Sequence, residues 1–371
     1  MCWFKSLFDV ILVSVILKME VLYFIVPMLV SVILMFPVKM LAKKYNLYAK
    51  ENNRTIHHGK IARVGGIAIF ASFMIFGYLF IKEHRTFDGL MIGAAIVFIG
   101  GLIDDIFDIK PIYKLAFQFA ATTALVFIGD IYLYEINLPL NITIRMKLLG
   151  YVITYLWVIG ITNAVNLIDG LDGLAGGFSI ITLMTIAILS TVIHHREVFV
   201  LCLILAGSTM GFLYFNFHPA SIFMGDCGAQ LLGYVIAAIS LYGFKSTTFI
   251  TLAIPVILMF IPIFDTFSAI IRRKLKGERI STPDKSHFHH VLMNGMGLGQ
   301  VGAVLTIYVA TALFGLTAYL YVVNRPIGLI LLVFLIILFE LFIEYTGMIS
   351  PKYRPILSLV DRLTDKKESE E

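Results

Sequence analysis

Long hydrophobic stretches alternate with short polar breaks along almost the whole of this chain of 371 residues. About 20 consecutive apolar residues are enough for one helix to span the hydrocarbon core of a bilayer. By that measure, the pattern predicts eleven membrane-spanning helices. They cover residues 20–42, 64–81, 89–103, 113–129, 148–165, 177–193, 198–215, 228–243, 249–271, 301–323 and 327–346. The expected fold class is therefore all-α, a polytopic transmembrane helical bundle.

The composition supports a membrane protein. Hydrophobic residues make up 59% of the chain and charged residues only 14%, whereas soluble domains carry about 25% charged residues. Apolar runs of this length indicate helices and not a barrel, because a helix pairs all its backbone groups within one segment. We expect one domain over 20–346, an N-terminal extension or interfacial segment at 1–19, and a charged tail at 347–371.

Basic residues are distributed unevenly between the two sides of the predicted bundle. The loops after odd-numbered helices and the C-terminal tail together contain 19 lysines and arginines, and the loops on the opposite side contain seven. Lysine and arginine accumulate on the cytoplasmic side of membrane proteins. These loops and the tail are therefore predicted to be cytoplasmic, and every polar cluster described below falls on that side.

The segment NAVNLIDGLDGLAGG (163–177) places two aspartates among four glycines at the end of the fifth predicted helix. An aspartate at the bilayer centre costs about 2.5–3.5 kcal/mol on insertion scales, and glycine disfavours an uninterrupted helix. We therefore expect a helix break that presents Asn166, Asp169 and Asp172 in one cytoplasm-facing active-site cleft. A glycine-rich turn with solvated aspartates is the alternative.

The segment GGLIDDIFDIKPIYK (100–114) contains a second group of acids, at the end of the third predicted helix. Asp104 and Asp105 are adjacent, and neighbouring carboxylates raise each other's pKa unless a cation is near. Three acids within five residues at a membrane boundary favour a functional site. A solvated helix end, with Lys110 and Lys114 as partners, is the alternative.

A third carboxylate lies in NFHPASIFMGDCG (216–228). Asp226 sits in a tight glycine turn, an arrangement that suits a hard cation such as Mg²⁺, which prefers oxygen ligands. Asn216 and His218 in the same segment are interpreted as turn and capping residues.

Two basic segments complete the cytoplasmic pattern. The first loop contains Lys60 and Arg63. Binding of substrate and attraction to anionic lipid headgroups explain this basic loop equally well. Cations beside an acidic, metal-binding cleft indicate an anionic, phosphorylated substrate. Zinc is disfavoured at the histidines of the last loop, because no Cys lies nearby to complete a tetrahedral set. The candidates in that loop are Arg279, His287, His289 and His290.

Three features together predict an enzyme that acts on a phosphate-bearing substrate with a lipid partner. They are acidic residues that can bind Mg²⁺ (with Mn²⁺ as an alternative), basic residues that can bind phosphate, and a position at the membrane surface. The sequence lacks GxxxxGK(S/T), which argues against a P-loop NTPase. Two rival classes remain. A cation-coupled transporter would place its acids near the membrane midplane, and a lipid-binding scaffold would not need Asp104, Asp105 and Asp226 together. Nucleic acid is not an expected partner.

At these residues the chain resembles the polyprenyl-phosphate N-acetylhexosamine-1-phosphate transferases of the WecA/TagO type, which are relatives of MraY. The resemblance covers about residues 20–345 and rests on GGIAIF, GGLIDDIFD, NAVNLIDGLDGLAGG, FMGDCGAQLLG and HFHH, in the family's order. It implies transfer of N-acetylglucosamine 1-phosphate from UDP-N-acetylglucosamine to undecaprenyl phosphate, with release of UMP. That step initiates a cell-envelope polysaccharide (O-antigen, common antigen or teichoic acid).

The resemblance also implies a bacterial plasma-membrane location, and the expected partners are the donor, the lipid acceptor, the bilayer and a second copy in a homodimer. The last loop reads HFHHV, where MraY-type chains carry contiguous histidines followed by Phe-Glu. This departure counts against a MurNAc-pentapeptide donor, and an MraY-like transferase remains the alternative. Deprotonation of the lipid phosphate by an aspartate and a covalent aspartyl-phosphate route both remain open.

The motifs and the basic loops together give one set of candidate site residues. As catalytic residues we expect Asp104, Asp105 and His287, and as metal ligands Asp226 and Asn166. As substrate-binding residues we expect Lys114, Asp169, Asp172, Arg279, His289, His290, Lys60 and Arg63.

Overall fold

The computed structural model of the chain describes residues 2–48, 61–82, 84–138, 142–243, 249–277, 287–350 and 353–359. The chain forms two compact units, Met1–Pro255 and Val256–Glu371, and each is described by itself. The fold is all-α, as predicted, apart from one hairpin within the described residues. In that hairpin, β1 (Glu135–Leu138) pairs antiparallel with β2 (Ile142–Arg145).

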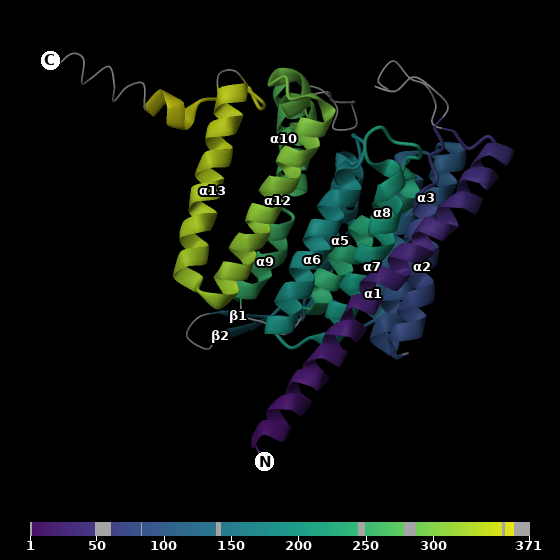
Figure 1. Cartoon of the computed structure of the whole chain (residues 1–371). Helices are drawn as coiled ribbons and strands as arrows, with labels where there is room; N and C mark the ends of the chain where they lie inside the picture. The colour runs from purple at the N-terminus through teal and green to yellow at the C-terminus, as the bar shows by residue number, and fades with distance from the viewer. Residues whose placement is uncertain are drawn as a thin grey trace. The chain divides into compact units, whose positions relative to one another are not determined.

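The first unit is a bundle in which the helices lie side by side, with the β1–β2 hairpin at one end (Figure 1). Its helices are α1 (Cys2–Lys44), α2 (Gly66–Phe80), α3 (Arg85–Phe107), α4 (Pro111–Thr123), α5 (Lys147–Ile168), α6 (Leu174–Val192), α7 (Arg196–Asn216) and α8 (Gly225–Gly243). α4 continues into a π-helical turn at Ala124–Ile128. The expected boundary at residue 20 falls inside α1, which is continuous from Cys2.

In the second unit, two long helices form an antiparallel pair joined by Asn324, whose side chain caps the second of them. The helices of this part of the chain are α9 (Phe249–Leu258), which crosses the unit boundary, α10 (Phe260–Leu275), α11 (Phe288–His290), α12 (Gly299–Val323) and α13 (Arg325–Thr346). The expectation of a single domain over 20–346 stays a prediction.

Among the described residues, eight helices are long and apolar enough to cross a membrane. The other three predicted spans fall on α2, which has 15 residues, on α8, and on the pair α9 and α10. The prediction of one continuous helix over 249–271 is wrong, because the helix is interrupted at Met259. Pro262 has no N–H to donate to the carbonyl of Leu258, and this weakens the helix at that point.

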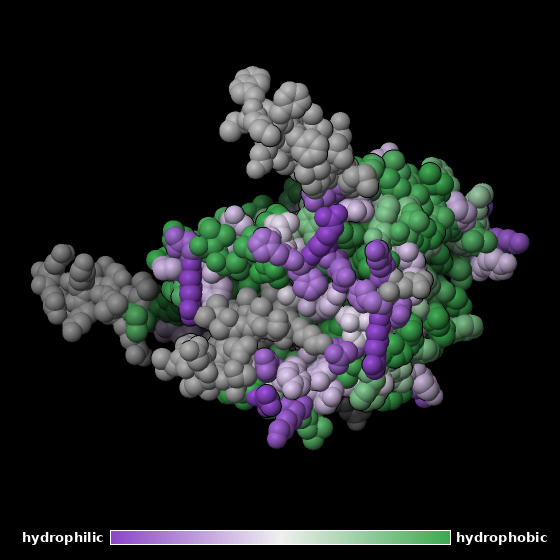
Figure 2. Space-filling view, turned by 90° about the horizontal axis from the view of Figure 1, so that it is seen from below, coloured by the Kyte–Doolittle hydropathy of each residue, from purple (hydrophilic) through white to green (hydrophobic). Residues whose placement is uncertain are grey.

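The helices differ in how much of their apolar surface they bury. The apolar window of α7 is 72% buried, whereas that of α1 is 22% buried. On the face shown in Figure 2, hydrophobic side chains cover large areas and hydrophilic side chains are gathered in patches. α7 is therefore an interior helix of its unit, and α1 presents apolar surface that suits lipid.

The start of α8 is approached very closely by two neighbouring helices. A Cβ on Gly66 of α2 would lie 2.3 Å from the amide nitrogen of Gly228, and a Cβ on Gly101 of α3 would lie 2.6 Å from the Cα of Cys227. Only glycine permits backbones to approach this closely. The start of α8 is thereby fixed beside the end of α3, where the acidic residues of both segments meet.

Candidate active site

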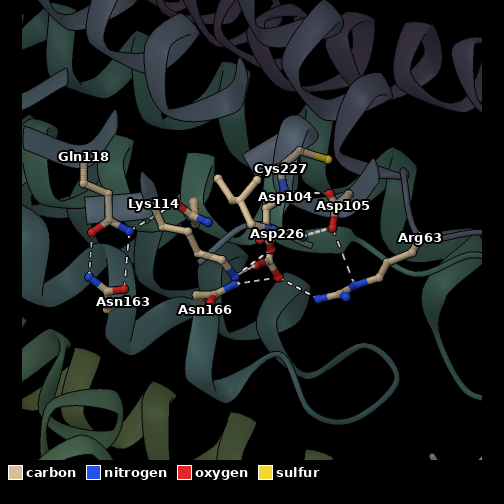
Figure 3. A network of polar contacts seen from close by, with 11 residues as sticks. Arg63, Asp104, Asp105, Lys114, Gln118, Asn163, Asn166, Asp226 and Cys227 are labelled. Atoms are coloured by element: carbon tan, nitrogen blue, oxygen red, sulfur yellow. Dashed lines mark hydrogen bonds and ion pairs between the residues drawn. The ribbon is translucent and has the colours of Figure 1, made fainter. Parts of the chain in front are cut away.

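Five charged side chains from four segments of the first unit converge (Figure 3). Two come from the end of α3, one from the start of α4 and one from the start of α8, and the fifth precedes α2. They are joined by ion pairs with N–O distances of 2.6–3.5 Å. We call this set the charged cluster: Arg63, Asp104, Asp105, Lys114 and Asp226.

Asp226 lies at the centre of the charged cluster and is buried. Its Oδ1 accepts hydrogen bonds from Nη2 of Arg63 (2.7 Å) and Nδ2 of Asn166 (3.3 Å), and its Oδ2 accepts one from Nζ of Lys114 (2.6 Å). Burial alone would raise the pKa of Asp226, but its hydrogen bonding and the two cations outweigh burial and hold the pKa well below its ordinary value. These contacts therefore favour the carboxylate form of Asp226.

Lys114 bridges two carboxylates that come from different helices. Its Nζ lies 2.6 Å from Oδ2 of Asp104 and 2.6 Å from Oδ2 of Asp226. The other oxygen of Asp104 accepts the backbone N–H of Ile109 (3.1 Å), in the turn that connects α3 to α4. The turn that ends α3 thus holds the Asp104 carboxylate against Lys114.

Asp105 has different surroundings from its neighbour. Its two oxygens accept the backbone N–H groups of Asp226 (2.8 Å) and Cys227 (2.9 Å), so it caps the start of α8 from another helix. Gly225, the residue before Asp226, has φ +77°, and a Cβ at this position would lie 2.5 Å from Oδ2 of Asp105. With both oxygens occupied, Asp105 is placed to hold Asp226 in position.

The helix break predicted after the fifth span is confirmed: α5 ends at Ile168 and α6 begins at Leu174. Burial raises the pKa of Asp169, in this break, to about 7, and attraction to Arg63 opposes the shift. Asp169 therefore lies within the electric field of the charged cluster, although its surroundings favour the neutral form.

Asp172 is buried in the same break and is tied to the loop between α7 and α8. Its Oδ2 accepts hydrogen bonds from Nδ1 of His218 (2.9 Å) and the backbone N–H of Ala220 (3.1 Å). Asn216 links the same two segments, because its Oδ1 accepts the N–H of Gly173 and its Nδ2 donates to the carbonyl of Ile222. Asn216 is a turn-stabilising residue, as interpreted, whereas His218 also pairs with a carboxylate.

In the second unit, His287 is held by a buried aspartate on α10. Nδ1 of His287 lies 2.8 Å from Oδ2 of Asp265, whose Oδ1 accepts the N–H of Phe288 (2.8 Å). Burial and the neighbouring His290 lower the pKa of His289 to about 3, so that ring is neutral. An aspartate that fixes Nδ1 of His287 orients the ring and leaves Nε2 to contact another group.

The structure thus brings together six of the predicted site residues: Arg63, Asp104, Asp105, Lys114, Asn166 and Asp226. Asp169 and Asp172 lie in the same unit, and His287, His289 and His290 lie in the second unit. Lys60 and Arg279 lie outside the described residues. Sequence reasoning assigned no role to Asp265, although a single acid inside an apolar span was a usable signal.

The side chains of the charged cluster fit the Mg²⁺ expected from the sequence in part. Within the described ranges, no group of three or more His, Cys, Asp or Glu side chains is arranged to hold a metal ion. The donor chemistry nevertheless suits a hard cation, because the carboxylates of Asp104 and Asp226 converge beside the amide of Asn166. The ammonium group of Lys114 already lies where these two carboxylates attract a cation.

Residues 87–244 match the family model described as Glycosyl transferase family 4. The probable undecaprenyl-phosphate N-acetylglucosaminyl 1-phosphate transferase of Bacillus subtilis is 38% identical over 352 residues, which cover 93% of this chain and 97% of that protein. The decaprenyl-phosphate N-acetylglucosaminephosphotransferase of Mycobacterium tuberculosis is 31% identical over 330 residues, which cover 80% of this chain and 81% of that protein.

The undecaprenyl-phosphate alpha-N-acetylglucosaminyl 1-phosphate transferase of Escherichia coli K12 is 29% identical over 294 residues, which cover 77% of this chain and 79% of that protein. The similarity to the Bacillus protein extends over nearly the full length of both chains. The resemblance seen in the motifs is confirmed, and the chain belongs to the family of polyprenyl-phosphate N-acetylhexosamine-1-phosphate transferases.

Proposed function

We propose that this membrane protein transfers N-acetylglucosamine 1-phosphate from UDP-N-acetylglucosamine to undecaprenyl phosphate and releases UMP. The observation that carries the proposal is the charged cluster, in which Asp226 is held between two cations. In addition, the chain is similar over nearly its full length to a relative named as an N-acetylglucosaminyl 1-phosphate transferase. The lipid-linked product would initiate a cell-envelope polysaccharide.

The distribution of basic residues supports a cytoplasmic position for the charged cluster, and the bacterial relatives support a location in the plasma membrane. A nucleotide sugar made in the cytoplasm would then meet a lipid phosphate at the inner surface of the bilayer. A homodimer stays a prediction.

The proposed reaction is a displacement at the β-phosphorus of the donor. An oxygen of the lipid phosphate forms a bond to that phosphorus, the bond from the phosphorus to the bridging oxygen breaks, and UMP leaves with the bonding electrons. Arg63 is suited to stabilise this charge, because 46% of its side chain is exposed while it still holds Asp226. Its remaining N–H groups can donate to phosphate oxygens.

The surroundings of the two adjacent aspartates support different tasks. We assign Asp104 to the acceptor side, where it would orient the lipid phosphate or take its last proton. Asp105 has both oxygens engaged by the start of α8 and acts by holding Asp226. In the second unit, Asp265 fixes the ring of His287, and donor binding by the other predicted residues of that loop stays a prediction.

The one-step and covalent routes make different predictions for the enzyme without its lipid acceptor. A covalent aspartyl-phosphate would release a burst of UMP equal to the amount of enzyme. A one-step transfer would release none. A single-turnover measurement with the donor alone therefore distinguishes them.

Mg²⁺ is part of the proposal, with Asp226 and the amide of Asn166 as the residues that would hold it. When bound, the ion would neutralise charge on the donor diphosphate. We expect chelation to abolish transfer, and added Mg²⁺ or Mn²⁺ to restore it. Full transfer after exhaustive chelation would contradict the metal requirement.

The proposal is tested with purified protein in detergent, incubated with UDP-N-acetylglucosamine, undecaprenyl phosphate and Mg²⁺, by measuring both UMP and the lipid-linked product. We expect product from the unaltered protein and none above background from Asp226→Ala. Asp88→Asn is the matched control, because Asp88 lies in the first turn of α3, at the end opposite Asp104. No UMP release from the unaltered protein, or equal release by Asp226→Ala, would overturn the proposal.

Donor identity is tested in the same assay with a panel of UDP-sugars. We expect UDP-N-acetylglucosamine to be the preferred donor. Preference for UDP-MurNAc-pentapeptide would favour the MraY-like alternative instead.

A further inference from the structure

Three amide side chains form a second polar cluster, which we call the amide cluster: Gln118, Asn163 and Gln230. Both glutamines are only 1% exposed. Nε2 of Gln118 donates to Oδ1 of Asn163 (3.3 Å) and to Oε1 of Gln230 (3.1 Å), and Nδ2 of Asn163 donates back to Oε1 of Gln118 (2.7 Å). Gln118 and Asn163 are therefore a reciprocal amide pair to which Gln230 is added.

Each amide lies one helical turn from a residue that contacts Asp226 or from Asp226 itself. Gln118 follows Lys114 by four residues on α4, and Gln230 follows Asp226 by four residues on α8. Asn163 precedes Asn166 by three residues on α5. Residues three or four apart lie on one face of a helix, about 5.4 Å apart along its axis. The amide cluster thus joins the same three helices one turn away from the charged cluster, and Figure 3 shows Gln118 and Asn163 beside it.

Side chains provide the main link between α4 and α8. α3 and α5 pack closely against α8, whereas backbone contact between α4 and α8 is slight. The polar bridges across this gap are Lys114 to Asp226 and Gln118 to Gln230, and the hydroxyl of Tyr234 approaches a carbonyl of α4. A phosphate substrate would compete with Asp226 for Lys114. The amide cluster contains no charged group that a phosphate would attract.

Packing alone does not account for Gln230. Its Nε2 has no hydrogen-bond partner within the part of the chain that the structure describes. A buried amide group without a partner is destabilising, and an apolar side chain of similar size would avoid that cost. Its Oε1, in contrast, is the acceptor that joins α8 to Gln118.

We infer that the amide cluster sets the register of α4 against α8 and so places Lys114 against Asp226, which makes Gln118 and Gln230 positioning residues of the reaction. This inference rests on the proposed function. Neutral amides suit the task, because they fix a distance between helices without changing the charge balance of the charged cluster. Misplacement of a reacting group by about 1 Å can lower a rate by about 100-fold.

The test uses Gln118→Met and Gln230→Met, which keep side-chain length and remove the hydrogen bonds. Thr122→Val is the matched control: Thr122 is buried on α4, one turn beyond Gln118, and its hydroxyl donates to the backbone carbonyl of Gln118 and not to the amide cluster's side chains. Two quantities are measured on each purified protein. The first is the rate at which an amine-reactive reagent labels Lys114 relative to the exposed Lys110, by mass spectrometry. The second is kcat and KM for both substrates.

We expect both methionine variants to label several-fold faster at Lys114 and to lose about 10- to 100-fold in kcat, with KM for the donor within about threefold. Thr122→Val should match the unaltered protein in labelling and in kcat. Unchanged labelling and kcat in variants that only unfold at lower temperature would overturn the inference. If the unaltered protein shows no transfer but both methionine variants still label faster at Lys114, the placement of Lys114 by the amide cluster stands and the proposed function is overturned.

Discussion

Polar clusters join the helices at both ends of α3 and α8, but the two clusters are built differently. At the end opposite the charged cluster, Nε2 of His84 donates to Oε2 of Glu197 (3.1 Å), and the hydroxyl of Tyr242 donates to the same oxygen. Nδ1 of His84 accepts the N–H of Phe87 (3.3 Å), so its ring is a neutral donor. We call His84, Glu197 and Tyr242 the far cluster.

The difference between the clusters is one of charge. The far cluster joins α3, α7 and α8 with one carboxylate and neutral donors, whereas the charged cluster holds three carboxylates with two cations. Hydrogen bonds from neutral groups are thus sufficient to tie these helices together. Carboxylates gathered in a buried place repel one another, which is a cost that functional sites carry and helix packing does not require.

The largest effect should follow from removing the central charge of the charged cluster. Asp226→Asn keeps the shape of the side chain but removes the carboxylate that holds both Arg63 and Lys114. We expect kcat/KM to fall about 1,000-fold, as on loss of a main electrostatic group. Steady-state kinetics of UMP release measure this, and a loss of less than tenfold would mean that the charge of Asp226 is not central.

A smaller but still large effect should follow from Gly225→Ala. Gly225 has φ +77°, and an added Cβ would lie 2.4 Å from the carbonyl oxygen of Arg63 and 2.5 Å from Oδ2 of Asp105. We expect about a 100-fold loss of kcat, because the start of α8 must shift. Gly243→Ala, at the other end of α8, is the control, since a Cβ there meets only ordinary contacts of 3.5 Å and beyond. Equal kinetics of the two variants would contradict this account.

The third effect is a pH dependence of stability caused by Asp169. Its pKa is raised by burial from 3.8 to about 7, so the folded protein keeps a proton that the unfolded chain loses. The contribution of this group to stability is therefore lost as the pH rises from about 4 to about 7. In thermal unfolding in detergent, we expect the unfolding temperature of Asp169→Asn to fall less over this range than that of the unaltered protein. Parallel curves would show that Asp169 ionises normally.

The smallest effect on catalysis should come from the far cluster. Glu197→Gln removes its carboxylate but keeps an oxygen that can accept from Tyr242 or His84. We expect kcat/KM to stay within about twofold and the unfolding temperature to fall by a few degrees. A tenfold loss of kcat/KM would show that the two ends of α3 and α8 are coupled in catalysis.

Sequence pattern predicted the fold class and most of the charged cluster, because the bilayer makes polar residues conspicuous. Asp104, Lys114 and Asp226 stand out at the ends of apolar runs, and the glycines after Asp169 predicted the break between α5 and α6. The interruption at Met259 was missed, because a window that counts apolar residues does not register the missing N–H of Pro262.

The contacts within the site could not be predicted, because they join residues that are far apart in sequence. The capping of α8 by Asp105 depends on the close packing of α3 on α8, and Asp265 pairs with His287 although the two are 22 residues apart in sequence. The amide cluster did leave a signal: Gln118, Asn163 and Gln230 each lie three or four residues from a predicted site residue, within an apolar helix.

The most direct test of the difference between the two clusters is one comparison of rates. Asp226→Asn and Glu197→Gln each replace one carboxylate by its amide, at opposite ends of the same bundle. The rate of lipid-linked N-acetylglucosamine diphosphate formation should be measured for both, side by side, in proteins that unfold cooperatively. We predict a rate for Asp226→Asn at least about 100-fold below that for Glu197→Gln. Equal rates would contradict the assignment of the charged cluster as the active site.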